Sequence, residues 1–279
     1  MVNVRIAESD VEKVEVYRFR YEYFQNVVQR FYVRGLDHVK KIHIEEIDAF
    51  SRHYYLEQDS RILGVLRHTR LGDVPKDILA KDDISDIFNL EAVLKIAELD
   101  KLSMNSRLIL DKSARGSAAL GILFSRVYMD GLLDGVELDF LTAAPSSIQV
   151  YRKSGYRRYR SGIEHPENGY DVPMVLMLND TDHLTSIKSP LLRTRRAVAH
   201  INSDLKLVEG LLDALWPRFK AYDEDTLRLP ALELSFALAE EGIFASLSRE
   251  EIDALFTFVT VFNLEPGEQI IAKHQRRDE

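Results

Sequence analysis

The stretch from Glu98 to Tyr156 decides the fold class. It reads ELDKLSMNSR (98–107), ILDKSARG (109–116), about 16 further residues with helical periodicity, VELDFLTA (136–143) and APSSIQVYRKSGY (144–156). This order predicts a strand, a turn, a helix over 117–133, a second strand and a short helix over 146–153. Strands joined by a helix indicate an α/β layer fold with a mixed central sheet and flanking helices.

The flanking sequence extends this pattern on both sides. Ser9 and Glu12 have the spacing of a capping box ahead of an amphipathic helix over 11–31. After Asp180 the strand signals fade, which predicts a linker over 181–190 and two parts, an α/β domain over 1–182 and a helical region over 183–279. Further strands are expected at 53–57, 61–68, 96–104, 136–142, 155–160 and 172–178.

The composition excludes several classes of function. The net charge of −8 speaks against general nucleic-acid binding, and the absence of cysteine excludes disulfides and thiolate nucleophiles. The eight histidines show no metal-ligand spacing, so no metal is expected. MVNVRIAESD (1–10) lacks the apolar core of a signal peptide, and no stretch approaches the ~18 apolar residues of a membrane span. A cytoplasmic protein without a transmembrane segment is the expectation.

The central block, closed by Tyr151-x-x-x-Gly155-Tyr156, resembles the GNAT acyltransferase superfamily. In that family the start of the central helix receives the pyrophosphate of coenzyme A, because free amide groups and the helix dipole favour an anion there. The resemblance also implies that the strand after this helix splays from its neighbour and admits the acyl-pantetheine arm between the two.

Motifs in the N-terminal part narrow the resemblance. Arg20-x-x-x-Phe24, Glu46-x-Asp48-x-Phe50, Gly64-x-x-Arg67 and Glu98-x-x-Lys101 occur in the order seen in acyl-homoserine-lactone synthases and the related long-chain N-acyl amino acid synthases. Both groups take acyl chains from acyl carrier protein. Lactone synthases have an acid where this chain has Ser51 and an arginine where Lys101 stands. These departures favour the N-acyl amino acid branch over an S-adenosylmethionine acceptor.

The loop before the central helix, RGSAALG (115–121), matches the phosphate-binding motif of the family in part. With Arg115 in the basic position, Ala118 and Leu120 stand where two small residues belong; the other register, Gly116 with Ala118, places Ser113 at the basic position. A carrier-protein donor has one phosphate on its phosphopantetheine arm, for which Arg115 and the helix start suffice. An ordinary helix start is the alternative. The donor-binding residues implied are Leu102, Ser103, Arg115, Gly116, Ser117 and Ala118.

Three residues are candidates for the chemistry. Amide formation requires a base for the amine, a stabilised oxyanion and an acid for the leaving thiolate. Glu98 is the candidate base, directly or through water, and its alternative is a structural carboxylate paired with Arg67 or Arg20. The resemblance implies Tyr151 as the general acid and a backbone amide near Met104, where the family's strand bulges, as the oxyanion donor. A tyrosine packed on the sheet is the alternative for Tyr151.

Two groups of residues are candidates for binding other molecules, the first for the acceptor and the second for the carrier protein. Arginine binds a carboxylate with two parallel hydrogen bonds, so the first group suits the carboxylate and the amine of an acceptor. A buried structural ion network is the alternative for this group. The second group places five cations in nine residues and suits an acidic carrier protein, with a solvated surface as the alternative. The acceptor candidates are Arg20, Phe24, Glu46, Asp48 and Arg67; the docking candidates are Arg152, Lys153, Arg157, Arg158 and Arg160.

The tail FASLSREEIDALFTFVTVFNLEPGEQIIAKHQ (244–275) resembles the start of a cyclic-nucleotide-binding domain. The sequence ends before a phosphate-binding cassette, so no cyclic nucleotide is expected to bind. A helical lid, or a module that forms a homodimer through the C-terminal helices, is the alternative.

Together these features predict an N-acyltransferase without a tightly bound cofactor. It would transfer a fatty acyl group from acyl carrier protein to the amine of an amino acid or a similar small amine by direct attack. An acyl-CoA-dependent GNAT acyltransferase is the second interpretation, and a catalytically inactive sensor or scaffold of the same fold is the third.

Overall fold

A computed structural model gives the fold. It describes residues 2–28, 33–81, 83–115, 118–160, 162–165 and 169–198, together with 248 and 251. The helical region and the tail resemblance expected beyond 198 lie almost wholly outside these residues, and so do Gly116 and Ser117. The division into two domains stays a prediction.

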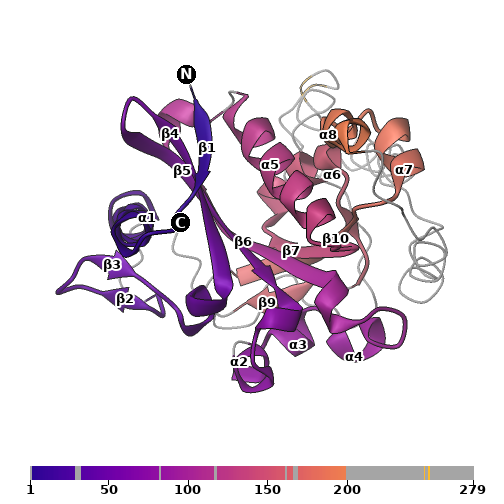
Figure 1. Ribbon diagram of the computed structural model, residues 1–279, viewed down its shortest axis with the longest axis horizontal. Helices are drawn as coiled ribbons and strands as arrows, with labels where there is room; N and C mark the ends of the chain where they lie inside the picture. Colours follow the sequence, from indigo (N-terminus) through magenta and orange to yellow (C-terminus); the bar gives the residue numbers. More distant parts are fainter. Residues whose placement is uncertain are drawn as a thin grey trace.

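A mixed sheet forms the centre of the molecule (Figure 1). Its strands run in the order β1-β4-β5-β6-β7-β10-β8, with β9 on β10, and β2 and β3 form a separate hairpin. The strands are β1 (Asn3–Ile6), β2 (Leu36–Asp37), β3 (Ile42–His43), β4 (Ser51–Gln58), β5 (Arg61–Arg70), β6 (Leu102–Leu110), β7 (Leu138–Ala143), β8 (Arg157–Arg158), β9 (Ile163–His165) and β10 (Gly169–Met177).

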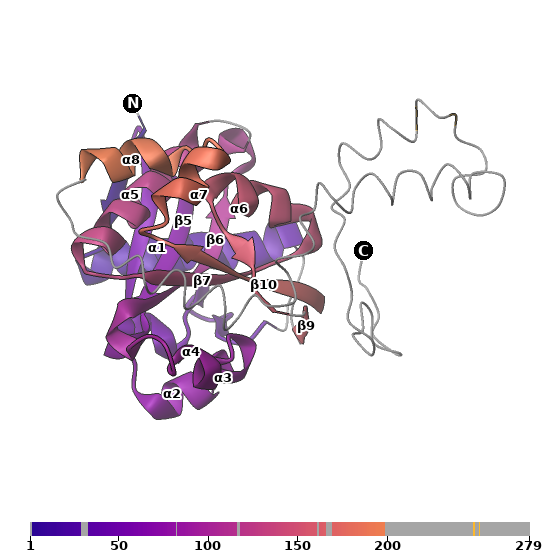
Figure 2. The ribbon, with the colours of Figure 1, turned by 90° about the vertical axis from the view of Figure 1, so that its right-hand side faces the viewer.

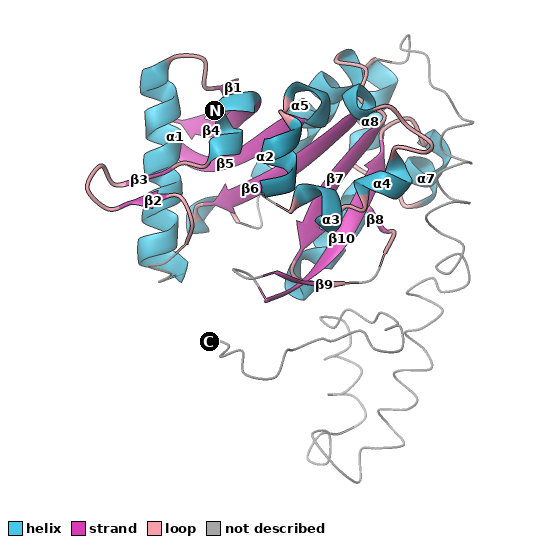
Figure 3. Cartoon of the chain, turned by 90° about the horizontal axis from the view of Figure 1, so that it is seen from below, coloured by secondary structure: helices cyan, strands magenta, loops and turns pink. Residues whose placement is uncertain are grey.

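Helices cover both faces of this sheet. Figure 2 shows α5 to α8 on one side and α2 to α4 on the other, and Figure 3 shows α1 beside β2 and β3. The α-helices are α1 (Asp10–Glu22), α2 (Lys76–Lys81), α3 (Ile84–Ile87), α4 (Leu90–Val93), α5 (Ala119–Leu133), α6 (Ile148–Ser154), α7 (Thr181–Ser186) and α8 (Leu191–Ala197). None of the helices in the described part of the chain is long and apolar enough to cross a membrane.

The pair β6–β7 is the parallel pair of the sheet, because α5 carries the chain from the end of one strand back to the start of the other. The helix presents an apolar stripe that includes Leu123, Phe124 and Val127, and this stripe packs on the sheet with Leu66 and Leu176. The expected fold class, a mixed sheet with flanking helices, is confirmed.

The glycine of the Tyr-x-x-x-Gly-Tyr close ends α6. Gly155 has φ +120°, which other residues rarely adopt, and its amide bonds back to the carbonyls of Tyr151 and Arg152. A Cβ there would lie 2.6 Å from Leu184 Cδ2 and 2.9 Å from Leu176 Cδ1. The glycine therefore lets α6 turn tightly against β10 and α7.

Several boundaries differ from the sequence-based expectations. The strand expected over 96–104 begins only at Leu102, because Leu99–Lys101 forms a 3-10 turn. The stretch expected to be a linker, 181–190, contains α7, and its Leu184 is fully buried against the core. The first helix has its capping box at Ser9 and continues as a π-helix over Tyr23–Val28.

Replacing Leu184 by alanine tests whether α7 belongs to the α/β core. Because Leu184 is fully buried, we expect Leu184→Ala to lower the free energy of unfolding by about 2–5 kcal/mol in urea denaturation. Leu133→Ala is the control, since Leu133 is 59% exposed on α5, and it should change stability by less than about 1 kcal/mol. Equal small changes in the two variants would show that α7 does not pack on the core.

Candidate active site

The pairing of β6 with β7 ends partway along the two strands, and we call the unpaired stretch beyond the last pair the slot. The two strands pair through three residue pairs, Leu102 with Leu138, Ser103 with Asp139 and Met104 with Phe140. Beyond Met104 the strand β6 continues to Leu110, and within the described residues no pairing to β7 accompanies it. Backbone amides and carbonyls that face this gap can bind an extended ligand with amide groups of its own.

A β-bulge lies on β6 inside the gap. The register with β5 passes from Arg67 opposite Ser106 to Val65 opposite Ile109, so two residues of β6 oppose one of β5. Arg107, one of the two, has φ 52°. The bulge turns the backbone of β6 locally and directs the Arg107 side chain to the α1 side. The bulge was expected at Met104 and lies three residues further along.

On the α1 side an ionic cluster lies against the slot. Arg20 donates to Asp48 at 2.9 Å, and Arg67 donates to Asp48 at 3.1 Å and to Glu45 at 2.7 Å. Arg107 donates to Glu45 through both Nε, at 2.7 Å, and Nη2. The ionic cluster consists of Arg20, Glu45, Asp48, His53, Arg67 and Arg107.

The charges of this cluster hold one another ionised. Burial raises the pKa of Asp48, but Arg20 and Arg67 outweigh it and lower this pKa to about 2. Burial likewise raises the pKa of Glu45, and Arg67 and Arg107 outweigh it, so the pKa lies well below its usual range. Within the cluster, three guanidinium groups therefore share two carboxylates.

Two buried histidines adjoin the cluster in the neutral form. His53 Nδ1 accepts from Arg20 at 2.9 Å, and its Nε2 lies 3.1 Å from the Asp48 carbonyl and 3.1 Å from the Tyr17 hydroxyl. Burial, and to a lesser extent the positive charge of Arg20, lowers the pKa of His53 to about 4. Burial, and to a lesser extent the positive charge of Arg107, lowers the pKa of His43 to about 4 as well. The His43 ring centroid lies 4.9 Å from that of Phe24.

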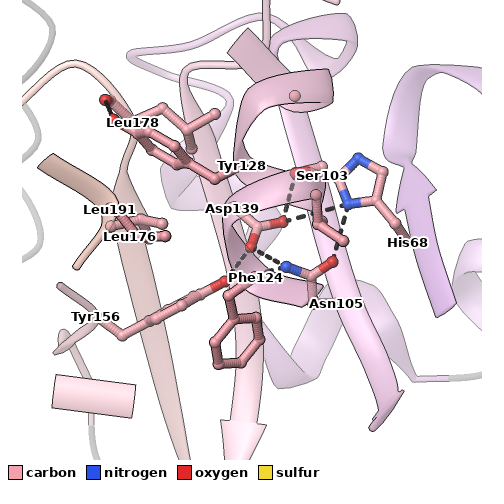
Figure 4. A pocket seen from close by; sticks show the side chains of 12 residues that line it. His68, Ser103, Asn105, Phe124, Tyr128, Asp139, Tyr156, Leu176, Leu178 and Leu191 are labelled. Carbon is pink, nitrogen blue, oxygen red and sulfur yellow. Dashed lines mark hydrogen bonds and ion pairs between the residues drawn. The ribbon is translucent and has the colours of Figure 1, made fainter. Parts of the chain in front are cut away.

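On the α5 side a second polar group lies at the start of the slot (Figure 4). Asp139 accepts hydrogen bonds from Ser103, Asn105 and Tyr156, and His68 Nδ1 lies 2.8 Å from the Asn105 side-chain oxygen. Burial raises the pKa of Asp139, although His68 and the three donors act against it. We call His68, Ser103, Asn105, Asp139 and Tyr156 the branch network.

The three candidates for the chemistry lie apart. Glu98 is exposed in the loop ahead of β6, not on the strand, and therefore lies beyond the paired end of the slot. Tyr151 on α6 is partly buried, with ring centroids 6.0 Å from Phe124 and 5.9 Å from Tyr156. Burial, and to a lesser extent the negative charge of Asp171, raises the pKa of Tyr151 to about 12, so its hydroxyl stays protonated near neutral pH. Met104 is buried at the last β6–β7 pair.

The expected donor-binding residues divide into two sets. Leu102 and Ser103 are fully buried at the paired end, and Ser103 donates to Asp139. Arg115 and Ala118 are exposed, and α5 begins at Ala119 without a hydrogen bond from a capping side chain. Arg115 Nε donates to the Leu110 carbonyl at 3.2 Å, which places its guanidinium beside the end of β6.

The expected acceptor residues are mostly brought together. Arg20, Asp48 and Arg67 meet in the ionic cluster and Phe24 borders it, but Glu46 is exposed and pairs with Lys81. Its neighbour Glu45 takes the expected place. The side chains of Arg20 and Asp48 are fully buried and that of Arg67 nearly so, whereas Glu45 and Arg107 keep exposed edges. A ligand therefore meets the cluster through the last two.

Much of the basic segment expected to dock a carrier protein serves the fold instead. Arg157 forms an ion pair with Asp180, Arg158 donates to the Arg160 carbonyl at 2.9 Å, and Arg160 donates to carbonyls at the end of α3. Arg152 is partly buried and Lys153 is exposed.

Sequence reasoning named Tyr156 only as the end of a motif, and it missed six other residues of these two groups: Glu45, His53, Arg107, His68, Asn105 and Asp139. A signal for the last two exists, because Ser103, Asn105 and Asp139 place polar side chains on one face of otherwise apolar strands. Within the described residues, no group of three or more histidine or carboxylate side chains is arranged to hold a metal ion.

The ionic cluster predicts a pH-dependent stability. Asp48→Asn leaves two buried guanidinium groups without their shared carboxylate, so we expect a loss of about 3–5 kcal/mol in the free energy of unfolding at pH 7. The depressed pKa of Asp48 stabilises the fold above the ordinary carboxyl range and is lost as the pH falls toward about 2. The difference between variant and wild type should therefore shrink between pH 4 and pH 2 in urea titrations. Glu46→Gln, at an exposed acid, is the control and should show neither effect.

Comparison with known proteins relates this geometry to a fold. The sequence matches no protein-family model and no curated protein. Among solved structures, the acyl-homoserine lactone synthase TofI, in complex with an inhibitor and MTA, is 14% identical and aligns over 69% of this chain and 99% of its own, with TM-score 0.51.

Two further structures are similar to this chain. The CoA-dependent acyl-homoserine lactone synthase BjaI, with SAM and isopentyl-CoA, is 13% identical over 76% of this chain and 98% of its own, with TM-score 0.51. FeeM, an N-acyl amino acid synthase from uncultured soil microbes, is 12% identical over 70% of this chain and 98% of its own, with TM-score 0.47. The likeness to TofI and BjaI shows that the chain has the GNAT-like fold of the acyl-homoserine lactone synthases, as its motifs predicted.

Proposed function

We propose that this protein is an N-acyltransferase that transfers a fatty acyl group from acyl carrier protein to the amine of an amino acid or a similar small amine. The observation that carries the proposal is the end of β6–β7 pairing at Met104 and Phe140, next to a bulge at Arg107. This arrangement leaves strand backbone available inside a sheet, where an extended thioester arm can pair with it.

The donor arm would enter from the start of α5. The N-terminal end of α5, which has no side-chain cap, and the exposed Arg115 suit the single phosphate of phosphopantetheine. The amide groups of the arm would then pair with β6 beyond Met104, which brings the thioester carbonyl to the backbone amides around the bulge. Such amides stabilise the oxyanion that forms on attack.

The acceptor would approach from the α1 side. Arg107 and Glu45 present the exposed edge of the ionic cluster, one with a positive and one with a negative charge. Arg107 suits the carboxylate and Glu45 the ammonium group of an amino acid. Arg20, Asp48 and Arg67 hold these two residues in place from within the protein.

The reaction is a direct aminolysis. The amine nitrogen attacks the thioester carbonyl, a C–N bond forms and the C–S bond breaks. Glu98 is the proposed base; because it lies in the exposed loop ahead of β6 and not in the slot, a chain of water molecules would carry the amine proton to it. Tyr151, which stays protonated near neutral pH, gives a proton to the leaving thiolate.

A second candidate is the same transfer with acyl-CoA as the donor. The observation that favours it is the engagement of Arg157 and Arg160 within the fold, which weakens the basic segment as a docking surface for an acidic carrier. The arm of coenzyme A carries the same pantetheine and would occupy the same slot.

A comparison of two donors tests the proposal. Thiol release would be measured from long-chain acyl carrier protein and from the matching acyl-CoA, with mixed amino acids present and products identified by mass. We expect release from the carrier with formation of an acylated amino acid. Release from acyl-CoA alone would establish the second candidate, and release from neither would leave a scaffold with this fold.

Glu98 is tested by a change that keeps its size. If Glu98 takes the amine proton, Glu98→Gln should lower kcat about 10²–10⁴-fold and leave donor binding unchanged. The control is Glu91→Gln, at an exposed acid on α4. Turnover that equals the wild-type value at every pH would remove Glu98 as the base.

A further inference from the structure

The branch network lies at the residues where β6 and β7 separate. We propose that Asp139 is a positioning residue that fixes the opening of the slot, because its single buried carboxylate ties together the strands on both sides of the opening and the end of α6. The effect on turnover rests on the proposed function, whereas the effect on the strands does not.

The register places Asp139 at the start of the opening. Asp139 pairs with Ser103, one residue before the last β6–β7 pair, and Asn105 is the first residue of β6 beyond that pair. Ser103 and Asn105 are two apart, so both side chains lie on the α5 face of the sheet. The bond from Asn105 to Asp139 therefore reaches back across the point where the backbone pairing has ended.

The hydrogen bonds of the network have one consistent direction. Asn105 donates its amide to Asp139, so its oxygen faces His68 and accepts from Nδ1 at 2.8 Å. The hydroxyls of Ser103 and Tyr156 donate to Asp139 as well. If the Asn105 amide were rotated, its NH2 group would face the Nδ1–H of His68, and its oxygen would face the Asp139 carboxylate. Neither contact could be a hydrogen bond. The arrangement thus specifies one position of β6 relative to β7.

His68 leaves one group for a solvent molecule. With Nδ1 donating, its Nε2 is an acceptor in the neutral ring, and it is buried without a partner among the described residues. The adjoining cavity, also lined by Tyr128 and Gly131, measures about 10 Å³, about the room that one water molecule needs. The space beside His68 therefore suits a water molecule, and the network is suited to support rather than to binding.

Tyr156 connects the network to the candidate acid. It follows Gly155 at the end of α6, donates to Asp139, and its ring lies 5.9 Å from that of Tyr151. The same face of the sheet contains a matched pair away from the opening, since Tyr54 on β4 donates to Asp130 on α5 at 2.9 Å. Both tyrosine hydroxyls are buried and both donate to an aspartate, but only Tyr156 acts at the branch.

The experiment compares Tyr156→Phe with Tyr54→Phe, each of which removes one buried hydroxyl. Amide hydrogen exchange should become about tenfold faster or more at residues 105–108 and 141–143 in Tyr156→Phe, and stay within about twofold there in Tyr54→Phe. With the donor that the wild type uses, kcat should fall about tenfold or more in Tyr156→Phe, with the KM for the amine within about twofold. Tyr54→Phe should keep the wild-type kcat.

A second variant separates positioning from general destabilisation. Asp139→Asn should slow turnover as Tyr156→Phe does, and the double variant should be no slower than Asp139→Asn alone, because both changes break one network. Additive losses, or equal exchange in the two tyrosine variants, would overturn the proposal. If the wild type releases no thiol from any donor, the proposed function fails, and the exchange comparison still decides whether Asp139 holds the opening.

Discussion

The structure depends on how the sheet tolerates the loss of pairing between β6 and β7. Unpaired backbone inside a sheet is unfavourable unless other groups satisfy it or hold the strands. Here the last pair, Met104 with Phe140, is buried among the side chains under α2 to α4, while Asp139 gathers three donors on the opposite face. The strands are thus fixed from both faces at the point where their ladder ends, and the opening beyond it is part of the fold.

Each face of the sheet has its own group of interacting polar side chains. The ionic cluster on the α1 face joins α1, β4, β5 and the bulge of β6 through charges that compensate one another. Each of its two carboxylates accepts from two guanidinium groups, and Glu45 and Arg107 are the members that keep exposed edges. The branch network on the α5 face has a single carboxylate, that of Asp139, which holds β6 and β7 together where their pairing ends. A ligand in the slot would lie between a rigid charged edge and a rigid branch.

The sequence predicted the order of elements and half of the ionic cluster, and it failed for residues whose positions depend on contacts with distant parts of the chain. The helical and strand periods of 98–156 specify β6, α5 and β7, because local patterning determines these elements. The choice between Glu45 and Glu46 is not local: the 3-10 turn over Glu46–Phe50 directs Glu45 inward to Arg67 and Arg107, which lie 22 and 62 residues away. The same holds for the bulge, which appears only when β6 is paired with β5.

The basic segment shows why a run of charges is a poor guide to a partner. Its arginines read as a docking surface in the sequence, yet Arg157 is paired with Asp180 and Arg160 binds the carbonyls that end α3. A guanidinium engaged in this way has lost its freedom to rearrange around another protein, and moving it would expose unpaired groups in the fold. Under the proposed function, selection of a donor would then depend less on the number of cations between residues 152 and 160 than on which thioester arm fits between β6 and β7.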